Sequence, residues 1–369
     1  MRIAQVAPLK DSVPPKHHGG VEQVVSSLTE ALVALGHDVT LFASGDSVTR
    51  AMLDPVCPRA PSLDPECHEP TARQLLMLER VACRASEFDV IHFHTDWLHM
   101  PLFSRLETPF VTTLHDRLDR AESRAMLQEF GWTPLVSVSD AQRKPAPLAN
   151  WFGTVHPGLP AGSLVPQPRP TGGYLAFLGR LSPDTQAEAA IRIAVASGRR
   201  IRIAAKIDPA DHDYVRARIK PVLGYHGVDF VGEIDEAQKA EFLGNADALL
   251  FPAARPEPFD IALIEAAACG TPVIAVGRGS VPEIVEHGLS GLIVRTEAEA
   301  VAAVDQVGAL SRMAIRRVFD RRFTSLRMAA TYAGVYATLV SVTSSPFATP
   351  AARIGSHPVS NRVWLHPRL

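Results

Sequence analysis

The chain has 369 residues, enough for two domains with substantial hydrophobic cores. Its 37 basic and 39 acidic side chains nearly balance, which argues against a broad nucleic-acid-binding surface and against an acidic disordered chain. The four cysteines form no C-x-x-C pair, which excludes a zinc ribbon, and the sequence offers neither a signal-peptide apolar region nor a run of about 18 apolar residues, so we predict a soluble cytoplasmic protein.

Short apolar segments alternate with helical patterns through the first half of the chain. The first strand is expected at Arg2–Ala7, and apolar residues at helical spacing predict a helix over Gly20–Leu35. Residues 46–70, rich in proline, serine and aspartate, are expected to form a loop. The further strands expected in this half are Val39–Ala43, Val90–Phe93, Phe110–Leu114 and Leu135–Val138. Strands separated by helices indicate a parallel sheet with right-handed crossovers.

A segment rich in proline and glycine, residues 156–173, predicts a hinge between two domains. The alternation then resumes, with strands expected at Tyr174–Leu178, Ile201–Ala205, Val228–Val231, Ala248–Phe251, Val273–Val276 and Leu292–Val294. Helices are expected at Ala187–Ala196, Ala237–Leu243 and Phe259–Ala268. Two α/β halves joined by a hinge form a cleft, and such sheets bind ligands at the carboxyl ends of their strands.

The most informative segment contains two glutamates eight residues apart, Glu257 and Glu265. Pro258 suits the first position of a helix and Gly270 its end, so the first-turn N–H groups are expected to face the cleft and hold a phosphate. The two carboxylates can bind two parts of a long ligand, such as a sugar hydroxyl and a ribose diol. By itself, such a pair is more often a helix cap and an exposed surface residue.

The segment resembles the E-x7-E signature of glycosyltransferase family 4, which consists of retaining enzymes with the GT-B fold. Segments that resemble the family's other motifs follow in the family's order: Gly19–Glu22, Asp89–His94, Thr112–Asp116, Leu135–Ser139, Phe177–Leu181, Gly279–Val285, Gly288–Val294 and a last helix from Phe323 to Leu339. The resemblance implies an α/β protein of GT-B architecture, with two Rossmann-like parallel-sheet domains facing a central cleft. Residues 1–155 and 324–340 would form the acceptor side, residues 174–323 the nucleotide-sugar side, and residues 341–369 a disordered tail.

The resemblance also implies roles for individual residues. The implied catalytic residues are His115, which would bond the transferred sugar, Glu257, which would orient its ring, and Arg180 and Lys206, which would stabilise the leaving diphosphate. The residues implied in donor binding are Gly19, Gly20, Phe259, Asp260, Ile261, Gly232 and Glu265, the last bonding the ribose. The residues expected to contact the acceptor are His18, His94 and Asp96.

The implied reaction is the retaining transfer of a hexose from a nucleoside-diphosphate sugar, a UDP or GDP sugar in the first place. The acceptor is a small molecule, glycan or lipid that the sequence does not identify. No residue stands out as a covalent nucleophile, so retention would follow the same-face route, in which the leaving phosphate helps to deprotonate the acceptor. We expect no metal ion, no other cofactor, no nucleic-acid partner and no membrane-spanning segment.

Three positions depart from the family's pattern, and at one of them Gln186 stands where the family has glycine. Thr185 replaces the lysine expected five residues after Arg180, and we expect Lys206 to supply the missing cation because it ends a strongly apolar strand and therefore faces the cleft. Asp260 stands where the family has glycine, and its carboxylate would repel a phosphate unless it turned away.

Other readings remain open. His92, His94 and Asp96 approach the H-x-H-x-D-H motif of binuclear zinc hydrolases, although Trp97 stands in place of the closing histidine. Asp211-His212-Asp213 is a D-x-D, the metal–nucleotide motif of GT-A glycosyltransferases, but acids are also favoured at a helix start. Two hinged α/β domains also suit a non-catalytic sugar- or nucleotide-binding protein.

Overall fold

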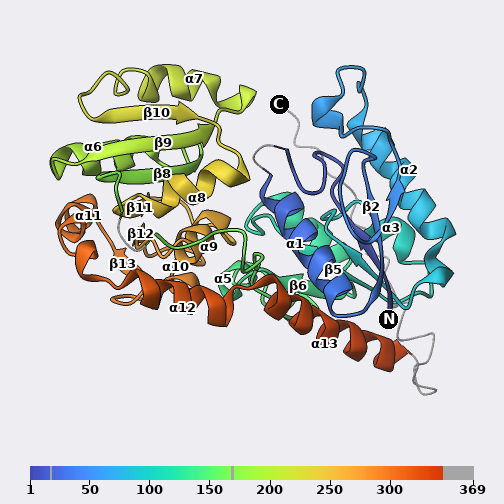
Figure 1. The fold of residues 1–369 in the computed structure, drawn as a ribbon. Coiled ribbons are helices and arrows are strands. Elements are labelled where there is room, and N and C mark those ends of the chain that lie inside the picture. Colours follow the sequence, from blue (N-terminus) through green and yellow to red (C-terminus); the bar gives the residue numbers. More distant parts are fainter. Residues whose placement is uncertain (17–18, 168–169, 344–369) are drawn as a thin grey trace, which may run out of the picture.

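The computed structural model describes residues 1–16, 19–167 and 170–343. These residues form two parallel β-sheets, each covered by helices, which lie side by side (Figure 1). Residues of both halves line a cleft between them. His18 lies outside the described residues, and so does the predicted tail apart from its first three residues, which end the last helix.

The amino-terminal half contains a seven-stranded sheet in the order β3-β2-β1-β4-β5-β6-β7. Its strands are β1 (Arg2–Val6), β2 (Asp38–Ala43), β3 (Met52–Pro55), β4 (Val90–Phe93), β5 (Phe110–Leu114), β6 (Leu135–Ser137) and β7 (Trp151–Thr154). Its helices are α1 (Gly20–Ala34), α2 (Pro70–Cys83), α3 (Met100–Phe103), α4 (Ala121–Glu129) and α5 (Asp140–Arg143). The central strands are buried on both faces and carry continuous apolar runs, which is why their positions follow from the sequence.

The two edge strands of the amino-terminal sheet, β3 and β7, differ from the sequence prediction. The expectation of a loop over residues 46–70 is wrong at β3, which pairs in parallel with β2, and β7 was not expected at all. Both strands are short and at least partly exposed along their whole length. An edge strand buries less apolar surface than a central one, so it leaves no apolar run in the sequence.

The carboxyl-terminal half contains a six-stranded sheet in the order β10-β9-β8-β11-β12-β13. Its strands are β8 (Tyr174–Arg180), β9 (Arg200–Lys206), β10 (Val228–Gly232), β11 (Ala248–Phe251), β12 (Val273–Val276) and β13 (Gly291–Val294). Its helices are α6 (Ala187–Ala196), α7 (His212–Tyr214), α8 (Glu236–Gly244), α9 (Ile261–Ala268), α10 (Val281–Ile284), α11 (Glu297–Val304) and α12 (Arg312–Arg322). The strand order reverses beside β1 in the first sheet and beside β8 in the second, and such switch points are where doubly wound sheets bind ligands.

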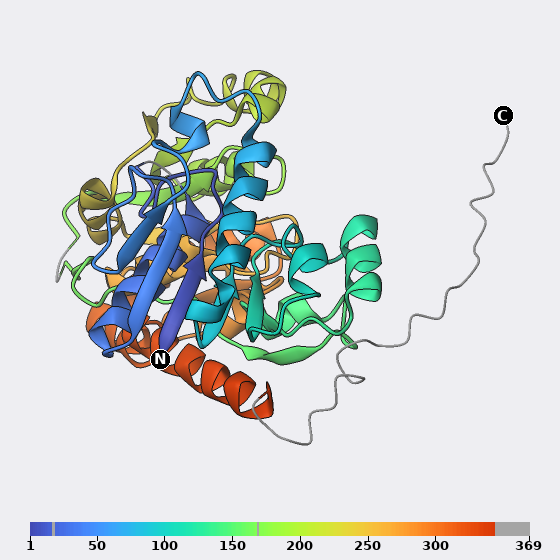
Figure 2. The same ribbon diagram turned by 90° about the vertical axis from the view of Figure 1, so that its right-hand side faces the viewer.

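The last helix, α13 (Ser325–Thr343), returns to the amino-terminal half. It continues from α12 along one side of the molecule (Figure 1) and crosses the edge of the first half in the turned view (Figure 2). Its residues Met328, Tyr332 and Tyr336 are buried in one core with Ile3 of β1 and Leu28 of α1. The chain therefore crosses between the halves twice, and the two crossings touch where Leu159 bridges Thr324.

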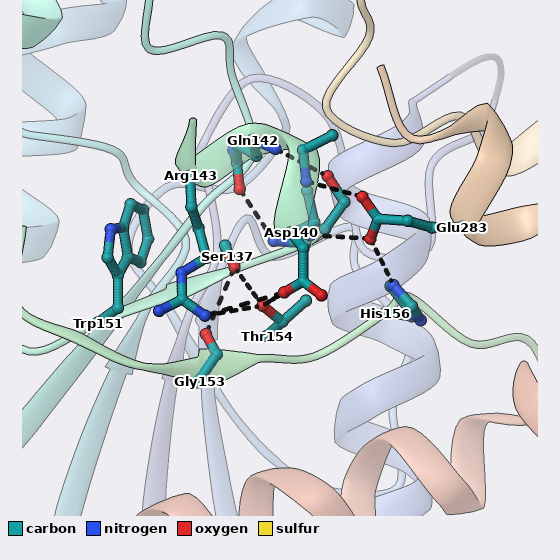
Figure 3. A network of polar contacts seen from close by, with 12 residues as sticks. Ser137, Asp140, Gln142, Arg143, Trp151, Gly153, Thr154, His156 and Glu283 are labelled. Carbon is teal, nitrogen blue, oxygen red and sulfur yellow. Dashed lines mark hydrogen bonds and ion pairs between the residues drawn. The ribbon is translucent and has the colours of Figure 1, made fainter. Parts of the chain in front are cut away.

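A second contact between the halves centres on Glu283 of α10 (Figure 3). Its carboxylate accepts hydrogen bonds from the backbone N–H groups of Asp140 and Ala141, at 2.8 and 2.7 Å. His156, in the segment between the sheets, lies 3.2 Å from the same carboxylate through its Nε2. The segment that the sequence predicts as a hinge is thus tied to both halves at this point.

Candidate active site

A cleft of about 520 Å³ lies between the two halves, at the carboxyl ends of the strands of both sheets. One wall comes from the loops after β1, β4 and β5, and the other from the ends of β8, β9 and β11 and from the start of α9. The predicted site residues that line it are Gly19, Gly20, His94, Asp96, His115, Arg180, Lys206, Glu257, Phe259, Asp260, Ile261 and Glu265. Gly232 lines no part of this cleft, although it ends β10 with a φ of 80°.

Arg180 and Lys206 lie side by side, because they are register partners at the ends of β8 and β9. Asp208 lies between them, with its carboxylate oxygens 3.4 Å from Arg180 Nη1 and 3.7 Å from Lys206 Nζ. Asp211 Oδ2 is 3.8 Å from Arg180 Nε. A diphosphate that binds these cations therefore competes with Asp208.

The carboxylates of the D-x-D segment are engaged by arginines. Asp211 pairs with Arg180, and Asp213 Oδ1 is 2.7 Å from Arg216 Nη2. Thr185, which replaces the expected lysine, donates its hydroxyl to the carbonyl oxygen of Arg180 at 2.6 Å. It thereby fixes the turn after β8 and supplies no charge.

Glu257 lies in the loop before α9, where a close backbone contact holds it. Gly279, with a φ of +55°, faces the backbone of Glu257, and a Cβ at that position would lie 2.5 Å from the Glu257 carbonyl oxygen. The next residue, Ser280, donates its backbone N–H to that oxygen at 3.2 Å. Only glycine fits this approach, which places the Glu257 side chain at the cleft, where burial raises the pKa of its carboxyl group.

The helix α9 begins at Ile261, three residues later than Pro258, so the predicted start is wrong. Asp260 is its N-cap, and Oδ1 accepts the backbone N–H of Ala262 at 2.8 Å. Asp260, which replaces the family's glycine, therefore caps the helix. Its carboxylate occupies the backbone N–H of Ala262, one of the first-turn groups that we expected to hold a phosphate. Burial, aided by the charges of Glu257 and Glu265, raises the pKa of Asp260 to about 7.

Glu265 is 1% exposed, and its Oε1 lies 2.7 Å from Nζ of Lys239 on α8. Lys239 also contacts Glu236, one turn before it, and lines the cleft. Burial disfavours the charge on Lys239, but the two carboxylates outweigh burial and raise the pKa of Lys239 above its ordinary value. The expected ribose-binding carboxylate thus carries its own counter-ion.

The predicted histidines separate into two groups. His94 and His115 line the cleft, and His94 Nδ1 lies 3.0 Å from His115 Nε2. His92 is completely buried behind them, with its two ring nitrogens hydrogen bonded to Tyr336 and Thr113. His92 therefore has no free nitrogen for a metal ion, which argues against the zinc-hydrolase reading.

Asp96 sits at the cleft in the left-handed region, with a φ of 49°. Burial and the charge of Asp116 raise the pKa of its carboxyl group to about 6. Strained backbone of this kind is concentrated at functional sites, where neighbouring structure holds it.

Comparisons with known proteins agree with this geometry. Residues 18–151 match the family described as Glycosyltransferase Family 4, and residues 167–316 match Glycosyl transferases group 1. The chain belongs to glycosyltransferase family 4. The activity of this glycosyltransferase is therefore the transfer of a glycosyl group.

Curated relatives match this glycosyltransferase over most of its length. The phosphatidyl-myo-inositol mannosyltransferase of Mycolicibacterium smegmatis is 26% identical over 338 residues, which cover 82% of this chain and 83% of the relative. A glycogen synthase of Mycobacterium tuberculosis is 27% identical over 343 residues, 76% of this chain and 79% of the relative.

Solved structures establish the GT-B fold. The sucrose-phosphate synthase of Thermosynechococcus elongatus has a TM-score of 0.74 at 19% identity and covers 92% of this chain and 99% of its own. HepE of Anabaena, solved in complex with UDP-glucose, has a TM-score of 0.72 at 16% identity and covers 92% of this chain and 100% of its own. Within the residues that the model describes, no helix combines the length and apolar character needed to cross a membrane.

Sequence reasoning missed Lys239 of this glycosyltransferase. Lys239 lies on α8 between Gln238 and Ala240, and its partner Glu265 is 26 positions further along the chain. The local sequence shows only the contact with Glu236, which is typical of an exposed helix face. Since pairing of distant charges leaves no periodic pattern, no local signal identifies this lysine.

The raised pKa of Asp260 leads to a pH prediction for the glycosyltransferase. Above pH 7 the carboxyl group is charged and repels a diphosphate, whereas below pH 7 it is neutral. Affinity for UDP-glucose should therefore rise about tenfold from pH 8 to pH 6. This corresponds to a rise of about one unit in the pKa of Asp260 when the diphosphate binds. Titration calorimetry at both pH values checks this expectation.

The control is Asp260→Asn, which keeps an N-cap but carries no charge. This variant should bind UDP-glucose equally well at both pH values and as tightly as the unaltered protein does at pH 6. If the variant and the unaltered protein show the same pH dependence, the assignment to Asp260 is wrong.

Proposed function

We propose that this glycosyltransferase moves a hexose from a nucleoside-diphosphate sugar to an acceptor hydroxyl, with retention of the anomeric configuration and without a metal ion. The observation that carries the proposal is the pair Arg180 and Lys206, held in register at the ends of adjacent strands in the cleft that also contains Glu257 and His115. A UDP or GDP sugar is the donor that we expect first. HepE, a structural neighbour, was solved with UDP-glucose.

The first task of such a site is to stabilise the leaving diphosphate. A guanidinium binds phosphate oxygens bidentately, and an adjacent ammonium adds a second charge. The start of α1 also lies at the cleft, and its N-cap, Gly19, provides no side-chain hydrogen bond to the first turn. Nothing lies within 4 Å of the place where a Cβ of Gly20 would be, so the backbone is open to a phosphate there.

The second task is to orient the sugar between the two halves. His115 from the amino-terminal half and Glu257 from the carboxyl-terminal half line the same cleft. In the proposed reaction, the bond from C1 to the β-phosphate oxygen breaks and the acceptor oxygen bonds C1 on the same face. The acceptor proton passes to the departing phosphate oxygen, so no protein nucleophile is needed. Asp96, at the amino-terminal wall, is the group that we propose for contact with the acceptor.

The test is turnover in the presence of EDTA. The protein is incubated with UDP-, GDP- or ADP-glucose, and release of the nucleoside diphosphate is followed, with water standing in for the unidentified acceptor. We expect release from one of these donors at a rate that EDTA does not change. If EDTA stops release and Mn²⁺ restores it, metal independence is wrong and the D-x-D carboxylates become the metal-site candidates.

A further inference from the structure

A chain of buried hydrogen bonds runs from the cleft to the last helix. It begins at His115, whose Nε2 lies 3.0 Å from Nδ1 of His94. The Nε2 of His94 lies 3.0 Å from Oε1 of Gln5 on β1, and Nε2 of Gln5 donates to the Tyr336 hydroxyl at 3.0 Å. Tyr336 belongs to α13, the helix that returns from the other half of the protein.

The chain continues behind the cleft. The Tyr336 hydroxyl lies 2.7 Å from Nδ1 of His92, and Nε2 of His92 lies 2.7 Å from the Thr113 hydroxyl. The Thr113 hydroxyl lies 2.8 Å from that of Tyr332, also on α13. All members behind His115 are at most 2% exposed, so water does not replace these partners.

The members of this chain fix one another's protons. Gln5 Oε1 only accepts hydrogen bonds, so His94 carries its proton on Nε2 and leaves Nδ1 as an acceptor. An acceptor at 3.0 Å requires a donor, so His115 carries its proton on Nε2. Burial lowers the pKa of His115 to about 4 and that of His94 well below its usual value, so both rings are neutral at pH 7.

We propose that Gln5 and His94 are positioning residues that hold His115 as its Nε2–H tautomer, so that Nδ1 of His115 presents a lone pair to the cleft and accepts a hydrogen bond from a hydroxyl of the transferred sugar. Nδ1 is the remaining ring nitrogen, and it has no hydrogen-bond partner among the residues that the model describes. The part of this proposal that concerns the sugar rests on the proposed function, whereas the tautomer does not. His94 has both nitrogens engaged, so it acts through His115 and not by contact with the acceptor.

Tyr336 gives α13 a part in this arrangement. Its hydroxyl accepts from the Gln5 amide nitrogen and lies 2.7 Å from Nδ1 of His92, to which it donates in the proposed proton order. The opposite orientation of the Gln5 amide would reverse every proton in the chain and make His115 Nδ1 a donor. The two proton orders therefore predict opposite tautomers for His115.

The test reads the tautomer directly, by ¹⁵N NMR of protein labelled at histidine, with His115 assigned from its missing signals in His115→Gln. No nucleotide sugar is present, so the result stands whether or not glycosyl transfer is detected. We expect a protonated Nε2 and an unprotonated Nδ1 on His115. A protonated Nδ1 would overturn the proposal.

Variants of Gln5 test the positioning role. Gln5→Met removes the acceptor for His94 and should leave His115 as a mixture of tautomers, with kcat about three- to tenfold lower, the equivalent of one hydrogen bond. Gln5→Glu keeps an oxygen for His94 and should restore both the single tautomer and most of kcat. Tyr332→Phe is the matched control, since it removes a buried hydroxyl from the same cluster without touching Gln5, and it should leave the tautomer unchanged. An unchanged tautomer in folded Gln5→Met would contradict the role of Gln5.

Discussion

Replacing Arg180 or Lys206 by methionine should each lower kcat for donor turnover by about 10²–10³, the usual cost of removing one group that stabilises developing charge. The two side chains lie next to each other at the ends of β8 and β9 and share Asp208 as a counter-ion. The leaving diphosphate gains charge as the bond to C1 breaks, so the loss should appear in kcat more than in KM. Steady-state kinetics of nucleoside-diphosphate release check both variants.

Two further variants make this prediction sharper. Asp208→Asn removes the carboxylate that competes for both cations, so it should lower KM for the donor. Adding Thr185→Lys to Lys206→Met should recover part of the lost rate. Thr185 lies in the turn after β8, where its hydroxyl contacts the carbonyl oxygen of Arg180, and it also lines the cleft. If Lys206→Met turns over at the unaltered rate, Lys206 does not replace the family's lysine.

Lys239→Met should lower the free energy of unfolding by about 3–5 kcal/mol at pH 8, because it leaves the buried carboxylate of Glu265 without its counter-ion. In this variant the folded state favours the protonated form of Glu265, so the pKa of Glu265 lies above its unfolded value of about 4.3. The free energy of unfolding of Lys239→Met is then retained at low pH and falls as the pH rises through the pKa of Glu265 in the folded state. Urea unfolding at pH 5 and pH 8 should show a smaller loss at pH 5.

Two variants serve as controls for Lys239→Met. Glu236→Gln removes the other partner of Lys239. The Glu236 side chain is 47% exposed, so this variant should change the free energy of unfolding by at most about 1 kcal/mol. Lys239→Met combined with Glu265→Gln removes both charges and should recover much of the lost stability. A loss that is the same at both pH values and persists in the double variant would mean that Lys239 acts by packing and not by charge.

The central strands of this protein follow from the sequence because their apolar residues are a local signal. Strands such as β8 and β11 carry unbroken apolar runs that only a sheet buried on both faces requires. The edge strands β3 and β7 lack such runs, and the start of α9 moves because Asp260 is a better cap than any residue before Pro258. These differences concern exposure and capping, which a hydrophobic pattern records weakly.

The candidate site follows from the sequence only in part. Motif positions such as His115, Arg180 and Glu257 lie together because each ends or follows a strand whose carboxyl end faces the cleft. The partners that set the charges and protons of the site come from distant elements. Asp208 is 28 positions from Arg180, and in the hydrogen-bond chain behind His115, Tyr336 is 244 positions from His92. Such pairs arise from the packing of α13 and of neighbouring strands, so the order of residues does not reveal them.

The measurement that tests the central claim most directly is proton NMR of the turnover reaction with the donor that releases its nucleoside diphosphate. The account predicts that an α-linked donor sugar is consumed, that the diphosphate and the transferred sugar appear together, and that the product first forms as the α anomer, with EDTA present. Arg180→Met should show none of these changes on the same time scale. A donor that binds in the cleft but is never consumed, or a product that first forms as the β anomer, would contradict the account.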